Sequence, residues 1–380
     1  MNASETYDLV FPETSGFDKS KIFFYRDRTD LKDFFYNNDF NIDRQRHIFV
    51  TDRTIADLNM LKPFVSLFNK TGDCVYTYQN DILVILGAGE KYKTIDNILL
   101  IIKAALDANF TRNCIFTAIG GGVICDMTGF AASMFKRGVD VEFVPTTLLA
   151  MVDASIGGKT GCDFDGYKNM IGSFYPAKRI YFFVPFIMTL SEREYKSGLA
   201  EAIKTAFLFN KDLCLIFENS RQKILNRDID TLYIIIKECV KAKANVVHKD
   251  FREKGERAYL NLGHTFGHAL ESTAGLGDIT HGEGVAWGMS RAACLSYKKG
   301  FCSKEYMDKV IDLLSDYGYD VSPVPSCLEN NKKNINLLLT AMHKDKKNQS
   351  SSLSRFTLQK DFCSTFMTEI EDSVIETVLQ

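Results

Sequence analysis

The sequence has no excess of charge of one sign, because 46 Lys and Arg residues nearly balance 48 Asp and Glu residues and leave a net charge of −2. A protein dedicated to nucleic acid would carry a cationic excess, so we expect no nucleic-acid partner. Long hydrophobic runs are also missing, since the longest, Ile180–Leu190, is too short to span a bilayer and contains Pro185. The first residues lack the basic and apolar regions of a secretory signal. These absences predict a soluble globular protein with no membrane partner.

The ten cysteines contain no Cys-x-x-Cys pair, which argues against a zinc ribbon or a disulfide framework. Several lie in apolar runs, as Cys114 does in the segment Asn113-Cys114-Ile115-Phe116. Reduced cysteines in such surroundings behave as small buried hydrophobic residues. We therefore expect free thiols and a cytoplasmic location. No repeat of 20–50 residues is present, so a solenoid is not expected either.

The 380 residues, of which 46% are hydrophobic, are enough for two domains. In the first half, short β-rich runs at 47–51, 81–86, 114–119 and 141–144 alternate with helical patterns. This alternation predicts βαβ units and a parallel sheet. Thr94 is the expected N-cap of a helix that continues to about residue 109, and a second helix is expected from Asp126.

Helical periodicity dominates from residue 192 to 299, and further helices are expected at 304–317 and 334–346. The fold class is therefore predicted as α/β plus all-α. An α/β domain with a parallel sheet would occupy residues 1–185, and a helical domain would occupy residues 186–380.

The first motif with chemical meaning is Gly120-Gly121-Gly122, directly after a predicted strand and before a predicted helix. Glycine lets the backbone approach a ligand closely, and a helix N-terminus offers free N–H groups to an anion. A dinucleotide pyrophosphate would fit this turn. The motif is not the usual G-x-G-x-x-G, so a merely tight strand-to-helix turn stays as an equal alternative.

A second motif combines Gly157-Gly158-Lys159 with Lys168-Asn169. Lysine supplies a mobile charge and exposed backbone amides supply fixed donors, so the segment could hold a phosphate or a carboxylate. It is not a Walker motif, and a solvated basic loop is the alternative.

The third motif places His264 and His268 on one helical face, with His281 shortly after. Neutral imidazole is the commonest zinc ligand in proteins, so we expect a metal site here. Thr265 stands where H-E-x-x-H has its glutamate, which argues against a metalloprotease. Histidines that only pack between helices are the alternative, and the residues alone do not identify an acidic ligand. For His47, His248 and His343 we expect surface or structural roles.

Taken together, seven segments between residues 82 and 290 and a DKK segment near 345 resemble the 3-dehydroquinate synthase family, within the sugar-phosphate cyclase superfamily. In the family's order they read GGGVICDMTGF, FKRGVDVEFVPTTLLAMVDASIGGKTG, YKNMIGSFYP, GLAEAIK, KAKANVV, REKGERAYLNLGHTFGHALE and HGEGVAWGM.

The resemblance implies an N-terminal Rossmann-like domain that binds NAD and a C-terminal helical domain that holds a divalent metal, zinc or cobalt. It also implies an active site between the domains and a homodimer. The implied reaction converts the seven-carbon sugar acid phosphate DAHP into 3-dehydroquinate and phosphate. It proceeds by transient oxidation with NAD, phosphate elimination, reduction and an intramolecular aldol closure, so NAD is not consumed.

The resemblance also implies roles for individual residues. The metal would be held by Glu201, His264 and His281. NAD would be bound by Asp52, Glu90, Lys93, Gly121, Gly122, Asp126, Thr146 and Thr147. The substrate phosphate would meet Lys159, Asn169, Asn261, His268 and Lys346, with Arg137 reaching in from the partner subunit. The substrate carboxylate would face Lys243 and Arg257. Near the reacting centre we expect Asp153, Lys168 and Lys204, with Glu253 as a proton acceptor.

Three departures from the family pattern are visible. Cys125 stands where glycine is common, residues 163–167 replace the usual stretch before Lys168, and Glu201-Ala202 replaces Glu-Val. The sequence leaves four alternative functions to compare with this one. An aminodehydroquinate synthase could use the same pocket. Cyclases of sedoheptulose 7-phosphate have no substrate carboxylate for Lys243 and Arg257 to bind, and a polyol dehydrogenase needs no phosphate cradle. A non-catalytic homologue is disfavoured because the implied metal ligands are all present.

Overall fold

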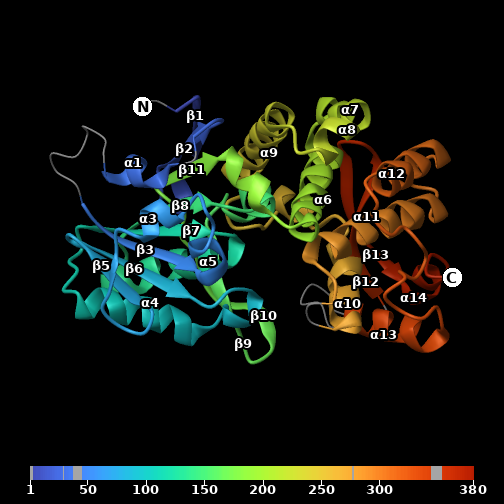
Figure 1. Cartoon of the computed structure of the whole chain (residues 1–380). Coiled ribbons are helices and arrows are strands. Elements are labelled where there is room, and N and C mark those ends of the chain that lie inside the picture. Colours follow the sequence, from blue (N-terminus) through green and yellow to red (C-terminus); the bar gives the residue numbers. More distant parts are fainter. Residues whose placement is uncertain (1–2, 29, 37–44, 276–277, 344–352) are drawn as a thin grey trace. The chain divides into compact units, whose positions relative to one another are not determined.

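The structure is a computed structural model that describes residues 3–28, 30–36, 45–275, 278–343 and 353–380 (Figure 1). The chain forms two compact units. Unit 1 contains Met1–Leu190 and Lys243–Arg252, and unit 2 contains Ser191–Ala242 and Glu253–Gln380. The domain boundary near residue 185 stays a prediction.

In the residues that the structure describes, unit 1 is built on a nine-stranded sheet in the order β1-β2-β11-β8-β7-β3-β6-β5-β4. The six strands from β2 to β6 in this order run parallel, and the outer pairs β1–β2, β6–β5 and β5–β4 are antiparallel. The parallel sheet predicted from the alternating pattern is thus confirmed. The strands are β1 (Glu5–Val10), β2 (Lys19–Tyr25), β3 (Arg46–Asp52), β4 (Asn69–Lys70), β5 (Val75–Tyr78), β6 (Asp81–Leu86), β7 (Cys114–Gly120), β8 (Asp140–Pro145) and β11 (Arg179–Phe183).

The helices of unit 1 follow local sequence signals with one correction. Thr94 caps α4 (Ile95–Asp107), as predicted, because its hydroxyl accepts a hydrogen bond from the backbone N–H of Asn97. The prediction that the next helix starts at Asp126 was wrong. Helix α5 (Gly122–Met134) begins four residues earlier, because the glycine turn continues directly into helical backbone. The shorter helices are α1 (Leu31–Tyr36), α2 (Arg53–Ala56) and α3 (Lys62–Val65).

A separate hairpin of unit 1 joins β9 (Lys159–Phe164) to β10 (Tyr167–Phe174). The two strands approach closely at Gly161 and Gly172, where a Cβ atom on either residue would collide with backbone atoms of the opposite strand. Glycine is therefore required for this pairing. The basic segment that the sequence suggested as a loop is thus a strand pair, and Lys168 and Asn169 lie in β10 just after its turn.

Unit 2 packs helices around a core that includes Tyr195, Phe207, Phe266, Trp287 and Leu295. Helix α9 contributes its first part to unit 2 and its last residues to unit 1. In the part of the chain that the structure describes, no helix is long and apolar enough to cross a membrane. The helices are α6 (Glu192–Phe209), α7 (Lys211–Asn219), α8 (Arg221–Leu225), α9 (Ile229–Lys249), α10 (His264–Ala274), α11 (His281–Lys298), α12 (Lys304–Asp316), α13 (Lys332–His343) and α14 (Asp372–Glu376).

The prediction that the second half contains only helices needs a correction. An antiparallel hairpin of β12 (Leu353–Asp361) and β13 (Ser364–Glu371) lies near the end of the chain. Phe356, Leu358 and Ile370 are buried, and Gln359 donates a hydrogen bond to the carbonyl of Phe207. The hairpin is thus held by tertiary contacts with α6, which a local helical pattern does not reveal. The predicted end of the 334–346 helix lies outside the described residues.

Candidate active site

Three side chains of unit 2 converge in the arrangement of a metal centre. Glu201 lies in the middle of α6, and His264 and His281 are the first residues of α10 and α11. One ligand atom from each lies within 4.8 Å of the other two. The Nε2 atoms of His281 and His264 lie 3.4 Å and 3.9 Å from Oε1 of Glu201. The structure thus brings together residues that are 80 positions apart in the sequence.

Glycines explain why these three helices meet. A Cβ atom on Gly267 would lie 2.9 Å from the carbonyl of Gly284, so α10 and α11 can touch only because both positions lack side chains. Gly282 packs in the same way against the backbone of Ser197 on α6, and its N–H donates a hydrogen bond to the Ser197 hydroxyl at 3.0 Å. Ser197 and Glu201 are one helical turn apart and share a face of α6. The first turns of both histidine-bearing helices are therefore held beside Glu201.

The electrostatics of the triad keep Glu201 ionised and His264 neutral. Burial raises the pKa of Glu201, but the ammonium of Lys204 and the imidazole of His281 outweigh burial and lower the pKa to about 2. Burial lowers the pKa of His264 well below its ordinary value, and the positive charge of Lys204 adds to this effect. For His281 burial lowers the pKa, but the neighbouring carboxylates of Glu201 and Glu271 outweigh it and raise the pKa to about 9.

The donor set fits a divalent cation. Both carboxylate oxygens of Glu201 are buried without a donor in hydrogen-bonding geometry, although Lys204 forms an ion pair with Oε2. The Nδ1 atom of His264 lies 3.2 Å from the carbonyl of Leu262, and Nδ1 of His281 lies 2.9 Å from Oε1 of Glu271. These bonds leave the Nε2 atoms to face Glu201. One carboxylate and two imidazoles are a common ligand set for zinc and cobalt, with positions left for substrate.

Of the other predicted residues of unit 2, His268 lies beside the triad, and Asn261 bonds to Glu253. His268 is exposed, and its ring centroid lies 5.2 Å from that of His264. The side-chain amide of Asn261 donates a hydrogen bond to Oε1 of Glu253 at 3.0 Å. Arg257 is buried, with 1% of its surface exposed. Lys346 lies outside the described residues.

In unit 1 the glycine turn ends β7 and opens α5. Gly121 is the N-cap of α5 and has no side chain to satisfy the first N–H groups of the helix. Thr147 packs beside Gly121, and Thr146 donates its backbone N–H to the carbonyl of Gly120. The buried hydroxyl of Thr146 has no hydrogen-bond partner among the described residues. The turn therefore offers free N–H groups and a hydroxyl, which suits an anionic phosphate group.

Cys125 does not obstruct this turn. Its side chain is buried, and its Sγ atom lies 3.8 Å from the carbonyl of Gly120. The side chain that Cys125 adds at this position therefore lies in the interior of unit 1.

A buried ion pair lies beside the turn. The Lys93 ammonium donates to Oδ2 of Asp126 at 2.7 Å and to Oδ1 of Asn169 at 2.6 Å. Burial lowers the pKa of Lys93, but the charges of Asp126 and Glu90 outweigh burial and raise it. Asp52 ends β3, and its carboxylate caps α2 through the N–H of Ile55. The N-terminal residues assigned to NAD therefore lie at the carboxyl ends of neighbouring parallel strands, where α/β sheets bind nucleotides.

Of the remaining predicted residues, Lys243 and Asp153 form a pair. The Lys243 ammonium donates to Oδ1 of Asp153 at 2.8 Å and to its carbonyl at 2.6 Å. Lys159, Lys168 and Arg137 are exposed. Lys243, placed by the resemblance at the substrate carboxylate, is thus directly bonded to a residue placed at the reacting centre.

The sequence reasoning missed Glu271, the partner of His281. Glu271 lies seven residues after His264 on α10, so it shares a helical face with His264 and His268. Metal-ligating histidines commonly donate their second N–H to a carboxylate. An acid on the face of a predicted metal-binding helix is therefore the signal that could have found it.

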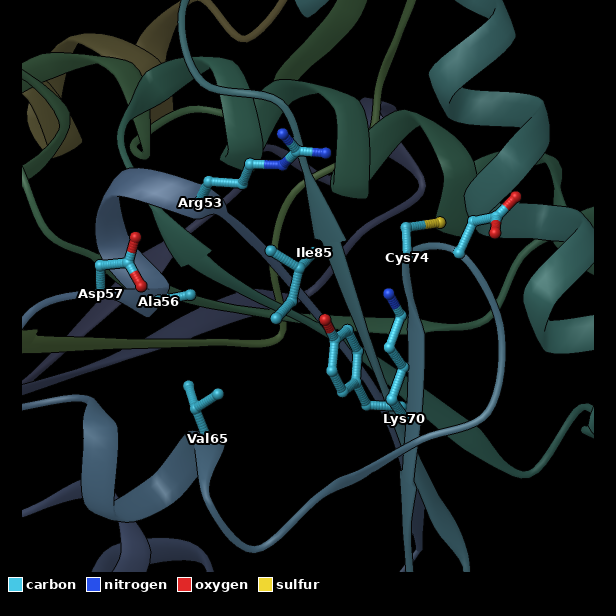
Figure 2. A pocket seen from close by; sticks show the side chains of 9 residues that line it. Arg53, Ala56, Asp57, Val65, Lys70, Cys74 and Ile85 are labelled. Atoms are coloured by element: carbon cyan, nitrogen blue, oxygen red, sulfur yellow. The ribbon is translucent and has the colours of Figure 1, made fainter.

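A cavity of about 410 Å³ in unit 1 does not coincide with these residues. Figure 2 shows Arg53 and Asp57 on one side of it, Lys70 and Cys74 on the other, and Ile85 between them. None of the described residues assigned to metal, cofactor or substrate lines this cavity.

Comparison with known proteins agrees with this architecture. The family model described as 3-dehydroquinate synthase N-terminal matches residues 83–197, and the model described as 3-dehydroquinate synthase C-terminal matches residues 198–348. The 3-dehydroquinate synthase of Dictyoglomus thermophilum is 41% identical over 70% of this chain and 72% of its own length. That of Francisella tularensis is 39% identical over 80% of this chain and 81% of its own length.

Among solved structures, a 2-deoxy-scyllo-inosose synthase complexed with carbaglucose-6-phosphate, NAD+ and Co2+ superposes with a TM-score of 0.80 at 21% identity, covering 99% of each chain. The fold is therefore that of this synthase, with a Rossmann-like domain and a helical domain. The two family models match most of the chain, and the two relatives are about 40% identical to it, so these comparisons identify the family as well as the fold. The chain belongs to the 3-dehydroquinate synthase family.

Proposed function

We propose that the chain converts DAHP into 3-dehydroquinate and phosphate. The observation that carries the proposal is the triad of Glu201, His264 and His281, with ligand atoms within 4.8 Å of one another in a chain that both family models match. An enzyme of this kind is a lyase that eliminates phosphate and closes a carbocycle.

The cofactors we propose are NAD and a divalent cation, zinc or cobalt. The 2-deoxy-scyllo-inosose synthase of the same fold was solved with NAD+ and Co2+, which supports this assignment. Glu201, His264 and His281 would hold the cation. The glycine turn at Gly121 and Gly122, with Asp126 and the other residues assigned to NAD, would hold the nucleotide. A bound cation supplies Lewis acidity at the substrate hydroxyl, and a bound nicotinamide supplies a hydride acceptor and donor.

The chain's own residues would bind and orient the substrate around these groups. The exposed imidazole of His268 lies close enough to the triad to hold a proton or a phosphate oxygen there. Glu253, bonded to Asn261, is our candidate proton acceptor. Holding an anionic substrate at several points converts the successive steps into reactions of one positioned molecule. The phosphate contacts proposed are Lys159, Asn169, Asn261, His268, Lys346 and Arg137 of the partner subunit; the carboxylate contacts are Lys243 and Arg257; and Asp153, Lys168 and Lys204 lie near the reacting centre.

A substrate with a carboxylate is supported by Lys243 and Arg257, two cationic side chains that the family pattern places at the substrate carboxylate. The planar guanidinium of Arg257 matches the geometry of a carboxylate. The relatives at about 40% identity are named 3-dehydroquinate synthases, which does not favour an aminodehydroquinate synthase, a sedoheptulose 7-phosphate cyclase or a polyol dehydrogenase.

The homodimer and the cytoplasmic location also belong to the proposal. All ten cysteines are free thiols, which is typical of proteins kept in a reducing compartment.

The decisive experiment measures phosphate release from DAHP with a catalytic amount of NAD. We expect EDTA to abolish the release and zinc or cobalt to restore it. The variants His264→Ala and His281→Ala should be inactive. His248→Ala is the matched control, because His248 is exposed and bonds to the carbonyl of Val10, outside the triad. Turnover of sedoheptulose 7-phosphate but not of DAHP would overturn the proposal.

A further inference from the structure

The β9–β10 hairpin meets the backbone of the segment before α4 at Asp163. The backbone N–H of Asp163 donates to the carbonyl of Lys93 at 2.8 Å, and an isolated parallel bridge joins Thr94 to Asp163. The hairpin forms its own two-stranded sheet, separate from the nine-stranded one. The backbone of Asp163 therefore links the hairpin to the segment that precedes α4.

The side chain of Asp163 reaches across the hairpin to a strained residue. Its Oδ1 atom accepts a hydrogen bond from the backbone N–H of Asn169 at 2.7 Å. Asn169 has a φ of 53°, in the left-handed region, and β10 shifts register between Tyr167 and Ile171. Asparagine tolerates this conformation better than most residues, and the bond to Asp163 stabilises it further. Asp163 thus fixes the backbone that directs the side chain of Asn169.

The Asn169 side chain closes the arrangement into a ring. Its Oδ1 atom accepts from the Lys93 ammonium at 2.6 Å, and the carbonyl of Lys93 accepts from Asp163. The ring therefore runs from Asp163 to Asn169, to Lys93 and back, and joins three separate segments. Lys93 is 5% exposed and also pairs with Asp126, so the ring lies against the ion pair beside the glycine turn.

We propose that Asp163 is a positioning residue, which holds Asn169 and Lys93 in the arrangement in which they bind the substrate phosphate and the nicotinamide cofactor. The inference rests on the proposed function, because that function assigns Asn169 and Lys93 their ligands. Asp163 itself touches neither ligand in this account. It acts as a hydrogen-bond acceptor, which its amide analogue can replace, since an asparagine Oδ1 atom accepts in the same geometry.

The first test is kinetic and compares Asp163→Ala with Asp163→Asn. We expect Asp163→Ala to raise KM for DAHP and the dissociation constant for NAD about tenfold, because one orienting hydrogen bond is lost. The value of kcat should change less, and Asp163→Asn should restore both constants to within about twofold of the wild type. Asp96→Ala is the control, because Asp96 is an exposed acid three residues from Lys93 that lies outside the ring.

The second test is hydrogen–deuterium exchange of the peptide that covers residues 165–171. Asp163→Ala should accelerate exchange there, and Asp163→Asn should not. This readout needs no activity, so it separates the two proposals. A wild-type enzyme that releases no phosphate from DAHP would refute the proposed function, whereas unchanged exchange in Asp163→Ala would refute the ring. A lowered melting temperature with unchanged KM in Asp163→Ala, or an Asp163→Asn variant as impaired as Asp163→Ala, would overturn the positioning role.

Discussion

Nδ1 of His281 lies 2.9 Å from Oε1 of Glu271, while Nε2 of the same ring lies 3.4 Å from Glu201. Glu271 is 7% exposed, and its carboxylate can only accept hydrogen bonds, so Nδ1 of His281 carries the proton. The Nε2 atom of His281 is then directed at Glu201. A carboxylate in this position sets both the tautomer and the orientation of a ligating imidazole.

Replacing Glu271 should therefore weaken metal binding without removing a ligand. We expect Glu271→Ala to lower zinc affinity about 10- to 100-fold, measured by competition with a chelator. Glu271→Gln retains an acceptor oxygen and should lose less. Glu305→Ala is the control, because Glu305 is an exposed acid paired with Lys309 on α12. Equal zinc affinity of the wild type and Glu271→Ala would contradict this role.

Arg257 should be needed for turnover. The variant Arg257→Ala would leave the substrate carboxylate without its guanidinium partner. A buried charge left without its partner costs about 3–5 kcal/mol, so kcat/KM for DAHP should fall by about two to four orders of magnitude. Arg257→Lys keeps the charge but not the two-pronged geometry, and we expect an intermediate loss. Zinc affinity, measured in parallel, should stay at the wild-type level. An unchanged kcat/KM in Arg257→Ala would rule out the carboxylate role.

The ion pair between Lys93 and Asp126 should contribute to the stability of unit 1. Lys93→Met leaves Asp126 without its cation, so we expect the free energy of unfolding of unit 1 in urea to fall by about 3 kcal/mol. Because the double variant Lys93→Met/Asp126→Asn removes both charges, it should recover part of this loss. Lys103→Met, which breaks an exposed pair with Asp107 on α4, should cost less than about 0.5 kcal/mol. The prediction fails if the single and double variants are equally destabilised.

The cysteines should differ sharply in their reaction with iodoacetamide. Cys327 and Cys363 are exposed, and burial raises the pKa of both thiols, so their labelling should accelerate steadily as the pH rises from 7 to 9. Cys125 is 1% exposed and burial raises its pKa well above the ordinary value, so it should remain unlabelled across this range. Peptide mass spectrometry measures both rates. Labelling of Cys125 in the folded protein at the rate of Cys327 would contradict the structure.

Features set by neighbours in the sequence could be predicted. Thr94 was recognised as an N-cap because the residue that it bonds, Asn97, is three positions away. The strands of the parallel sheet were recognised because a strand buried on both faces needs a continuous apolar run. The hairpin of β12 and β13 was missed because its strands are stabilised by each other and by α6, and neither partner is visible in a local pattern.

The candidate site divides in the same way. His264 and His268 are four residues apart, so helical geometry alone placed them on one face. The sequence contains 48 acidic residues, and no spacing distinguishes Glu201 among them as a metal ligand. Only the resemblance to the family pointed to Glu201. Lys243 and Asp153 are 90 residues apart, and their bond depends on the folded chain.

The last residues of α9 belong to unit 1 although the chain has already entered unit 2. Unit 1 is therefore not one continuous stretch, and a gene fragment that ends at Leu190 lacks residues 243–252. Recombination between related genes at one breakpoint near Leu190 would take Asp153 from one parent and Lys243 from the other. Every functional chimera of this kind must therefore preserve both members of this ion pair.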